Sequence, residues 1–256
     1  MARRTRTESA TGIYHVIMRG INKQLIFENP EDFDRFKKCL DNAKEKDGIR
    51  LYGYCLMDNN VHLLVGIGSD HIGASIKRIG VGYAIWFNRK YERCGGLFQD
   101  RFRSEPINDD VYLLSALRYI HQNPVKAGMC KRVEDYRWSS YADYIGEDDG
   151  LADAADILAM FSAKPQNQTK LFVEFMEEES DAGFADIDDD ARSSDENLRE
   201  RMFHLCGAKN ATEVQRLAPD ERSQALKLMR NDGMSIRQIV RLTGVPFGIV
   251  RKTGRA

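Results

Sequence analysis

Residues 49–67 read I-R-L-Y-G-Y-C-L-M-D-N-N-V-H-L-L-V-G-I, which is two apolar runs separated by a short polar stretch. The runs at 49–57 and 61–67 are rich in apolar, aromatic and β-branched residues, as strands are. Asp58 and Asn59 lie between them, and both residue types are common in turns. The stretch therefore predicts a β-hairpin.

On both sides of this hairpin, strand and helix patterns alternate. Residues 14–19 (Y-H-V-I-M-R) have the pattern of a strand, and residues 32–46 carry apolar side chains at helical spacing. After the hairpin we expect a helix at 72–91, a short strand at 102–107 and a helix at 111–122. The order β-α-β-β-α-β-α predicts an α+β fold of the ferredoxin-like, split β-α-β type with one extra helix. We expect the helices to cover one face of the sheet and to leave the other face available for a ligand.

Charge is unevenly distributed along the 256 residues, although the net charge is only −1. Residues 1–146 carry a net charge of +5, residues 147–200 one of −13 and residues 201–256 one of +7. Two basic ends around an acidic middle favour a polyanion-binding protein, but such blocks are also common on solvated surfaces. We predict an α+β domain at 1–146, an acidic linker with short helical patches at 147–200 and an all-α domain at 201–256.

The composition is that of a globular protein, with 42% hydrophobic and 30% charged residues. No apolar run approaches the roughly 18 residues of a membrane-spanning helix, and the N-terminus lacks the apolar centre of a secretory signal. We therefore expect a cytoplasmic protein that contacts no membrane. The five cysteines form no C-x-x-C pair, which favours reduced thiols over disulfides or structural zinc.

The last segment, residues 234–252, has the pattern of a helix-turn-helix. Ser235 would cap a first helix that runs to Leu242, residues 243–245 would form the turn, and Pro246 would open a second helix. The alternative is an amphipathic helical pair that packs on its own domain. The candidate DNA contacts are Arg237, Arg241, Arg251 and Lys252, together with Arg3, Arg4 and Arg6 of a basic N-terminal arm.

Two pairs of residues could carry chemistry. Asn60 and His62 are two apart on a predicted strand, so their side chains share a face, where an imidazole and an amide oxygen can ligate Mg²⁺ or Mn²⁺. Tyr119 and Asn123 are four apart on a predicted helix and share a helical face. We expect Pro124 to end that helix, which would free the Asn123 side chain for a ligand. Taken singly, a strand histidine and a helical tyrosine more often have structural roles.

Two further histidines, His15 and His121, could substitute as metal ligands, but we interpret both as structural. His121 is two positions from Tyr119 and therefore roughly 200° around the helix, so it should face away from the tyrosine.

Five strings between residues 14 and 141 together resemble one family, in order and in spacing. They are Y-H-V-I-M-R-G (14–20), C-L-M-D-N-N-V-H-L-L (55–64), G-L-F-Q-D-R-F-R (96–103), R-Y-I-H-Q-N-P-V-K-A-G (118–128) and Y-R-W-S-S-Y (136–141). They resemble the single-tyrosine transposases with a His-hydrophobic-His metal motif, in particular the REP-associated tyrosine transposases.

The resemblance implies that residues 1–146 are a catalytic domain that binds a single-stranded DNA hairpin and cleaves the strand by transesterification. Tyr119 would attack the phosphorus and form a 5′-phosphotyrosine, and Asn60, His62 and Asn123 would hold Mg²⁺ or Mn²⁺. Duplex DNA at the C-terminal domain and a second copy of the chain in a homodimer are further candidate partners.

The sequence departs from the family pattern at two positions, since the family usually has histidine in place of Asn60 and proline in place of Asp58. An amide oxygen is a weaker ligand for transition metals than imidazole, so the first change bears on metal affinity and rate rather than on DNA binding. Asp58 would share the face of Asn60 in a regular strand and is a candidate to assist it. The alternative function is a non-catalytic DNA-binding regulator on the same fold.

Overall fold

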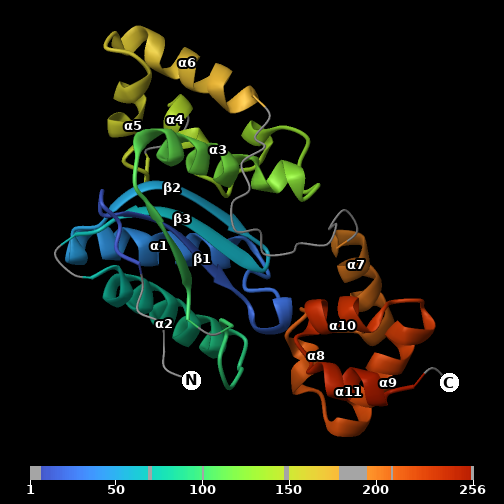
Figure 1. Cartoon of the computed structure of the whole chain (residues 1–256). Helices are drawn as coiled ribbons and strands as arrows, with labels where there is room; N and C mark the ends of the chain where they lie inside the picture. Colours follow the sequence, from blue (N-terminus) through green and yellow to red (C-terminus); the bar gives the residue numbers. More distant parts are fainter. Residues whose placement is uncertain are drawn as a thin grey trace.

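The computed structural model describes residues 7–68, 71–99, 101–146, 150–178, 195–208 and 210–254. A four-stranded antiparallel sheet lies at the centre of the N-terminal part (Figure 1). Its strands are β1 (Ile13–Arg19), β2 (Arg50–Met57), β3 (Asn60–Gly66) and β4 (Arg103–Ile107). They lie in the order β2-β3-β1-β4, so β3 separates the two strands that α1 (Pro30–Asp47) connects. This is the split β-α-β arrangement that the sequence predicts.

The pairing of β1 with β3 determines which side chains share a face of the sheet. In the antiparallel register, Ile17 lies opposite His62 and His15 lies opposite Leu64. Because successive side chains on a strand alternate between faces, Asn60, His62 and Leu64 share one face with His15. The apolar side chains that alternate with them on β3 point to the other face and belong to a separate core.

That other face is covered by α1 and α2 (Ile72–Lys90), which pack side by side beneath the sheet in Figure 1. Pro30 begins α1 at a position where its missing N–H is not needed, and Gly48 ends the helix in the left-handed conformation. Aromatic rings fill much of this first core, among them Phe27, Phe33, Phe36, Tyr54, Tyr83 and Phe87.

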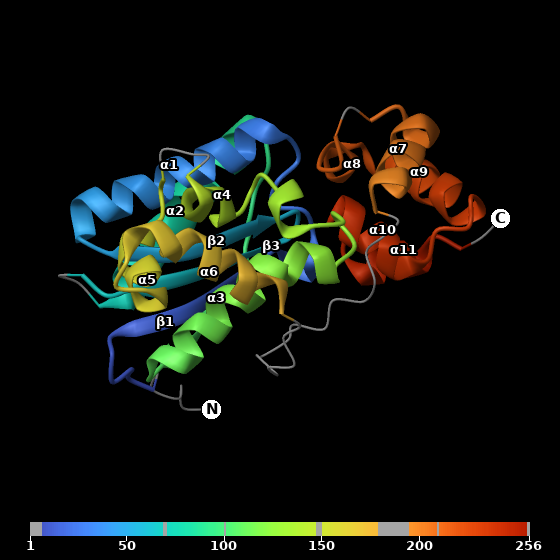
Figure 2. The same cartoon turned by 90° about the horizontal axis from the view of Figure 1, so that it is seen from above.

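The face that we expected to remain open is covered as well, so that expectation is wrong. Helices α3 (Asp110–Lys126), α4 (Tyr141–Ile145), α5 (Ala154–Phe161) and α6 (Pro165–Glu177) lie over it (Figure 2). Leu113, Leu117 and Ile120 of α3 form a second core with Met57 and Leu64 of the sheet. Full burial of one such side chain contributes about 1.5–3 kcal/mol, which is why the apolar side of α3 closes on the sheet.

The helices α5 and α6 lie within residues 147–200, where the acidic composition predicted a linker. The structure differs from that prediction, because Ile157, Phe172 and Met176 are buried in the second core. The acidic side chains of these two helices lie on the outer surface, so net charge masked an amphipathic pattern. The rest of the acidic stretch, residues 179–194, lies outside the described residues.

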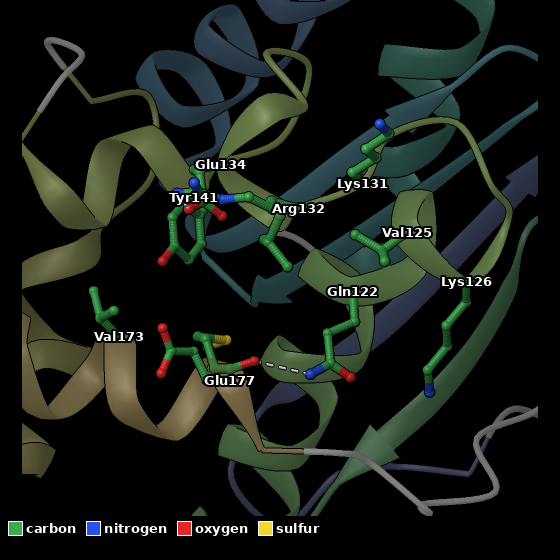
Figure 3. Close-up of a pocket in the computed structure, with 11 residues that line it drawn as sticks. Gln122, Val125, Lys126, Lys131, Arg132, Glu134, Tyr141, Val173 and Glu177 are labelled. Atoms are coloured by element: carbon green, nitrogen blue, oxygen red, sulfur yellow. Dashed lines mark hydrogen bonds and ion pairs between the residues drawn. The ribbon is translucent and has the colours of Figure 1, made fainter.

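A cavity of about 800 Å³ lies on the outer side of α3, between its C-terminal half, α6 and the short 3-10 helix η2 (Val133–Asp135) (Figure 3). Gln122 lines it and fixes α6 to α3, because its Nε2 donates to the carbonyl oxygens of Met176 and Glu178 at 2.9 and 2.8 Å. Both basic and acidic side chains line the wall, including Lys131 and Glu177.

The C-terminal helices gather beside one end of the sheet in both views (Figures 1 and 2). They are α7 (Asp195–Cys206), α8 (Glu213–Arg216), α9 (Pro219–Asn231), α10 (Ile236–Thr243) and α11 (Phe247–Lys252). Ser235 caps α10 by accepting from the N–H of Gln238 at 3.2 Å, and Gly244 ends it at a φ of 67°. The two predicted helices and their turn therefore lie where the sequence places them. Within the described ranges, no helix is both long and apolar enough to cross a bilayer.

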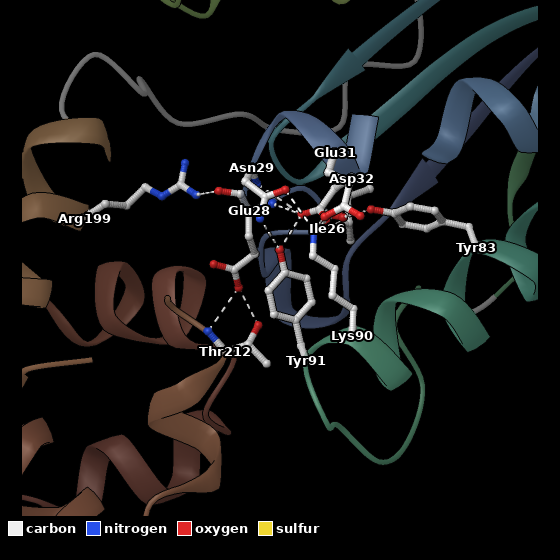
Figure 4. Close-up of polar contacts among 10 residues, drawn as sticks. All are labelled: Ile26, Glu28, Asn29, Glu31, Asp32, Tyr83, Lys90, Tyr91, Arg199 and Thr212. Carbon is white, nitrogen blue, oxygen red and sulfur yellow. Dashed lines mark hydrogen bonds and ion pairs between the residues drawn. The ribbon is translucent and has the colours of Figure 1, made fainter. Parts of the chain in front are cut away.

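The C-terminal helices dock on the segment between β1 and α1, which includes the 3-10 helix η1 (Ile21–Lys23). Leu25 of this segment is buried in the C-terminal core. The carboxylate of Glu28 accepts from the N–H group of Ala211 at 3.0 Å. It also accepts from the N–H group of Thr212 at 3.0 Å and from the Thr212 hydroxyl (Figure 4). Arg199 donates to the Glu28 carbonyl oxygen at 3.3 Å. We call this set of contacts the Glu28 joint.

The Glu28 joint is held in place by Asp32, which is fully buried at the start of α1. One Asp32 oxygen accepts from the N–H groups of Glu28 and Asn29 and from the Tyr91 hydroxyl, and the other accepts from Lys90 (Figure 4). Asp32 thus ties the segment that carries Glu28 to the end of α2.

The Glu28 joint yields a stability prediction. Glu28→Ala leaves two buried N–H groups and a hydroxyl without their acceptor, which should lower the free energy of unfolding of the C-terminal domain by about 1–3 kcal/mol. Amide hydrogen exchange at Ala211 and Thr212 should accelerate, whereas Glu45→Ala on the exposed side of α1 should change neither quantity. Unchanged exchange at both amides would show that the joint does not depend on this carboxylate.

Glu28 also makes the stability depend on pH. Desolvation by burial raises the pKa of Glu28 above its ordinary value of 4.5, against the opposing effect of the hydrogen bond from Thr212. The folded protein then binds the Glu28 proton more tightly than the unfolded chain does. The contribution of this carboxyl to the free energy of unfolding therefore decreases as pH rises above 4.5 and through the raised pKa. Glu28→Gln keeps an acceptor without a charge and should reduce this decrease in unfolding experiments across pH.

Candidate functional site

The structure brings the predicted site residues together between α3 and the sheet. Tyr119 and Asn123 project from α3 towards the sheet face that carries Asn60 and His62, and all four side chains are buried. The Nδ2 atom of Asn123 lies 3.1 Å from Nε2 of His62. The Tyr119 ring meets the His62 ring edge to face, with 5.9 Å between centroids.

A second histidine belongs to this cluster, although the sequence interpretation treated it as purely structural. Nε2 of His15 lies 3.1 Å from Nδ1 of His62, and the two rings stack with 5.4 Å between centroids. Tyr119 packs edge to face against His15 as well, at 5.9 Å. The strand pattern alone could not show this contact, because it depends on β1 being the neighbour of β3.

The cluster extends across the sheet to β4, in which the sequence analysis identified no candidate residue. Glu105 lies directly opposite His15 in the register of β1 with β4, and its Oε2 is 3.9 Å from Nδ1 of His15. The other oxygen of Glu105 accepts from the hydroxyl of Tyr112, which is on α3. We call this series of neighbouring side chains, Tyr112–Glu105–His15–His62–Asn123, the polar chain. Its first and last members are both on α3.

One arrangement of protons is consistent with the contacts of the polar chain. With Nδ2 of Asn123 donating to Nε2 of His62, a neutral His62 ring carries its proton on Nδ1. Nδ1 of His62 can then donate to Nε2 of His15. Burial lowers the pKa of His15 from 6.5 to about 4, so His15 is neutral at pH 7, and its Nδ1 faces Glu105.

We expected the proline that follows Asn123 to place this residue at a helix end, but the structure differs. Pro124 lies inside α3, which continues to Lys126. The proline removes one N–H, but the N–H groups of Ala127 and Met129 still close the last turn on the carbonyl oxygens of Asn123 and Pro124. The position of Asn123 is therefore set by a regular helix.

The remaining candidates near the motif have other roles. His121 faces away from Tyr119, as predicted: its Nε2 lies 2.8 Å from the Ser140 hydroxyl, and burial lowers its pKa to about 3. Asp58 lies in the turn before β3, and its carboxylate is 3.6 Å from Arg199 of α7. The turn that precedes Asn60 is thus in contact with the C-terminal domain.

The candidate DNA contacts of the C-terminal domain differ in accessibility. Arg237, Arg251 and Lys252 are exposed, whereas Arg241 is half-buried. The short helix α11 also exposes the apolar side chain of Phe247. Arg3 and Arg4, and with them Arg6, lie outside the described residues.

A lysine lies beside the tyrosine on the exposed edge of α3. Nζ of Lys126 is 5.6 Å from the centroid of the Tyr119 ring, and the side chain extends away from the other residues that line the cavity (Figure 3). In the described part of the chain, no three His, Cys, Asp or Glu side chains form a group that could hold a metal ion. Any ion at this site would therefore depend on the amide oxygens of Asn60 and Asn123 beside His62.

Comparison with known proteins identifies transposases as similar proteins. The family described as IS200-like transposases matches residues 9–123. A protein of Haemophilus influenzae assigned to the REP-associated tyrosine transposases is 23% identical over 150 residues, which cover 54% of this chain and 84% of the relative.

Two solved structures are similar at lower sequence identity. The structure of a REP-associated tyrosine transposase bound to a REP hairpin aligns with a TM-score of 0.49 and 17% identity, over 60% of this chain and 93% of the other. A transposase structure from Deinococcus radiodurans aligns with a TM-score of 0.34 and 19% identity, over 43% of this chain and 89% of the other. The family match covers the segment that carries Asn60, His62, Tyr119 and Asn123, so residues 9–123 are similar to the IS200-like transposases.

Proposed function

We propose that this chain is a strand transferase that cleaves single-stranded DNA beside a hairpin, with Tyr119 as nucleophile and a divalent cation bound near His62. The observation that carries the proposal is the contact of the Tyr119 ring with His62 while His62 is hydrogen-bonded to Asn123. Nucleophile and candidate ligands thus meet within one buried cluster of a domain that is similar to the IS200-like transposases.

In the proposed reaction, the Tyr119 oxygen attacks the scissile phosphorus and forms a new P–O bond. The bond from phosphorus to the 3′-oxygen breaks, the phenol proton passes to solvent, and the 3′-oxygen takes up a proton to give a free 3′-hydroxyl. The ammonium group of Lys126 is placed to attract the phosphate that becomes attached to Tyr119. Attack by a 3′-hydroxyl on the phosphotyrosine reverses the step and rejoins strands without ATP.

The candidate ligands fit a hard divalent ion that is shared with DNA. Asn60, His62 and Asn123 would hold Mg²⁺ or Mn²⁺, which supplies Lewis-acid chemistry at the phosphate. All three side chains are neutral, and Mg²⁺ usually binds through carboxylates together with substrate phosphates. The negative charge must therefore come from the DNA, so the ion should bind tightly only when the strand is present.

The same neutral set supports a second candidate function. With asparagine in place of the first histidine of the motif, the chain could bind hairpins as a regulator and cleave them poorly or not at all. Cleavage with a covalent adduct separates the two functions.

Tyr119→Phe tests the nucleophile. The variant should form no covalent adduct with a labelled hairpin, in the presence of Mg²⁺ or Mn²⁺, that survives a denaturing gel. Its hairpin affinity should stay within a few fold of wild type, because the phenyl ring keeps the edge-to-face contacts with His15 and His62. Tyr52→Phe is the control, since it removes the hydroxyl of a half-buried tyrosine on β2 that is outside the polar chain. Undiminished adduct in Tyr119→Phe would exclude the assignment.

Asn60→His tests whether the departure from the family motif limits the rate. Imidazole binds Mn²⁺ and other first-row ions better than an amide, so nicking should increase, most clearly at low metal concentration. Asn60→Leu controls for the larger side chain at this fully buried position. If the histidine variant fails to cleave with every metal tested while hairpin binding persists, the regulator becomes the better description. If its nicking rate merely equals that of wild type, asparagine is not limiting.

The DNA contacts of α11 are tested by neutralising Arg251 and Lys252 together. Deleting the C-terminal domain would uncover Leu25 and Glu28, so substitution is the cleaner change. Each phosphate contact that is lost should reduce the slope of log affinity against log salt by about 0.9 unit on duplex DNA. Neutralising Lys170 and Lys227, which are exposed on α6 and α9, is the charge-matched control. Equal slopes for the two double variants would make α11 a packing element.

A further inference from the structure

We propose that His15, faced by Glu105, is a positioning residue that holds the His62 ring with its proton on Nδ1 and its lone pair at Nε2 directed towards Asn123. The inference rests on the proposed function, because the role of this arrangement would be to present Nε2 of His62 to a divalent ion. It adds two residues, on β1 and β4, to a site that the motif places on β3 and α3.

The strand registers place the three side chains in one row. Glu105 is directly opposite His15 across β1 and β4, and His62 is the diagonal neighbour of His15 across β1 and β3. His15 is fully buried and His62 nearly so, which leaves no bulk water to supply alternative hydrogen-bond partners at this contact. The His62 ring is thus held on one side by His15 at 3.1 Å and on the other by Asn123 at 3.1 Å.

The proton positions follow from the ends of the row. The carboxylate of Glu105 can only accept and favours an N–H at Nδ1 of His15, 3.9 Å away. With that proton on Nδ1 of His15, Nε2 of the same ring is an acceptor for the proton that His62 carries on Nδ1, at 3.1 Å. The opposite tautomer of His62 would point an N–H at the amide N–H of Asn123 and a lone pair at the lone pair of His15.

Metal-binding histidines usually donate their second N–H to a carboxylate or carbonyl, which fixes the tautomer and orients the ring. Here the acceptor for the second N–H of His62 is the His15 imidazole, and the carboxylate of Glu105 lies on the far side of His15. Tyr112 of α3 donates to Glu105 and so keeps the carboxylate beside His15. A histidine that only filled space would have no influence on the tautomer of His62, and this difference can be measured.

The test uses the full chain, free of DNA and metal, with ¹⁵N-labelled histidine. Long-range ¹H–¹⁵N spectra report which ring nitrogen carries the proton, and the five histidines are assigned by substitution. In wild type, His62 should be protonated on Nδ1. In His15→Phe, the form protonated on Nε2 should become populated, whereas His15→Gln should restore the wild-type pattern because its amide oxygen can accept from Nδ1.

The control is His121→Phe, which removes an equally buried histidine on the other side of α3 and should leave the His62 signals unchanged. If His15→Phe does not fold, Glu105→Gln replaces it: loss of the carboxylate should increase the fraction of His62 that is protonated on Nε2. A His62 tautomer that is the same in wild type and in the folded variants overturns the proposal, as does a wild-type ring protonated on Nε2.

A second readout separates this proposal from the proposed function. The Mn²⁺ concentration that gives half-maximal nicking should rise roughly 10- to 100-fold in His15→Phe and return to within a few fold of wild type in His15→Gln. If the tautomer responds to His15 but wild type forms no adduct, the positioning role stands and the strand-transferase function fails. If wild type forms the adduct but neither the tautomer nor the Mn²⁺ dependence responds, the positioning role fails alone.

Discussion

The antiparallel register of β1 between β3 and β4 is the constraint on which the rest of the site depends. It places Glu105 opposite His15 and His62 diagonally next to it, with all three side chains on the face beneath α3. A slip of one residue would turn the strand over, so that His15 would enter the apolar core under α1 and α2. The apolar alternation on β1 and β3, with Val16 and Met18 facing that core, opposes such a slip. Hydrophobic patterning thus fixes the position of the polar residues.

Helix α3 completes the cluster, because its side chains reach both ends of the polar chain. Tyr112, Tyr119 and Asn123 are separated by seven and four residues and therefore lie along one side of the helix. The first donates to Glu105, the last contacts His62, and Tyr119 packs against both imidazoles between them. The apolar side chains of α3 bury the rest of the sheet face. In the proposed function, DNA would therefore meet the site at the exposed edge of α3, where Lys126 lies, rather than on an open sheet.

The period-two and helical spacings predict that Asn60 shares a strand face with His62 and that Tyr119 shares a helical face with Asn123, because these spacings are local. The family resemblance, rather than the spacings, implied that the two pairs meet. The sequence could not reveal the roles of His15 and Glu105, since these depend on which strands are neighbours. The acidic composition around α5 and α6 hid an apolar side that is visible only as Ile157, Phe172 and Met176 at their buried positions. Pro124 misled for a related reason: a proline near the end of a helix removes only one hydrogen bond, and the turn that follows compensates for it.

The two departures from the family motif are two residues apart, at the turn that leads into β3. Asn60 begins the strand, and Asp58 precedes it in the turn. The carbonyl oxygen of Asp58 accepts from the N–H groups of Ile26 and Phe27, two residues that flank the approach to Glu28, and its carboxylate faces Arg199. Arg199 also binds the Glu28 carbonyl oxygen. A proline at position 58 would provide no carboxylate for this arginine. The turn that precedes the first candidate ligand is therefore also part of the surface on which the C-terminal domain docks.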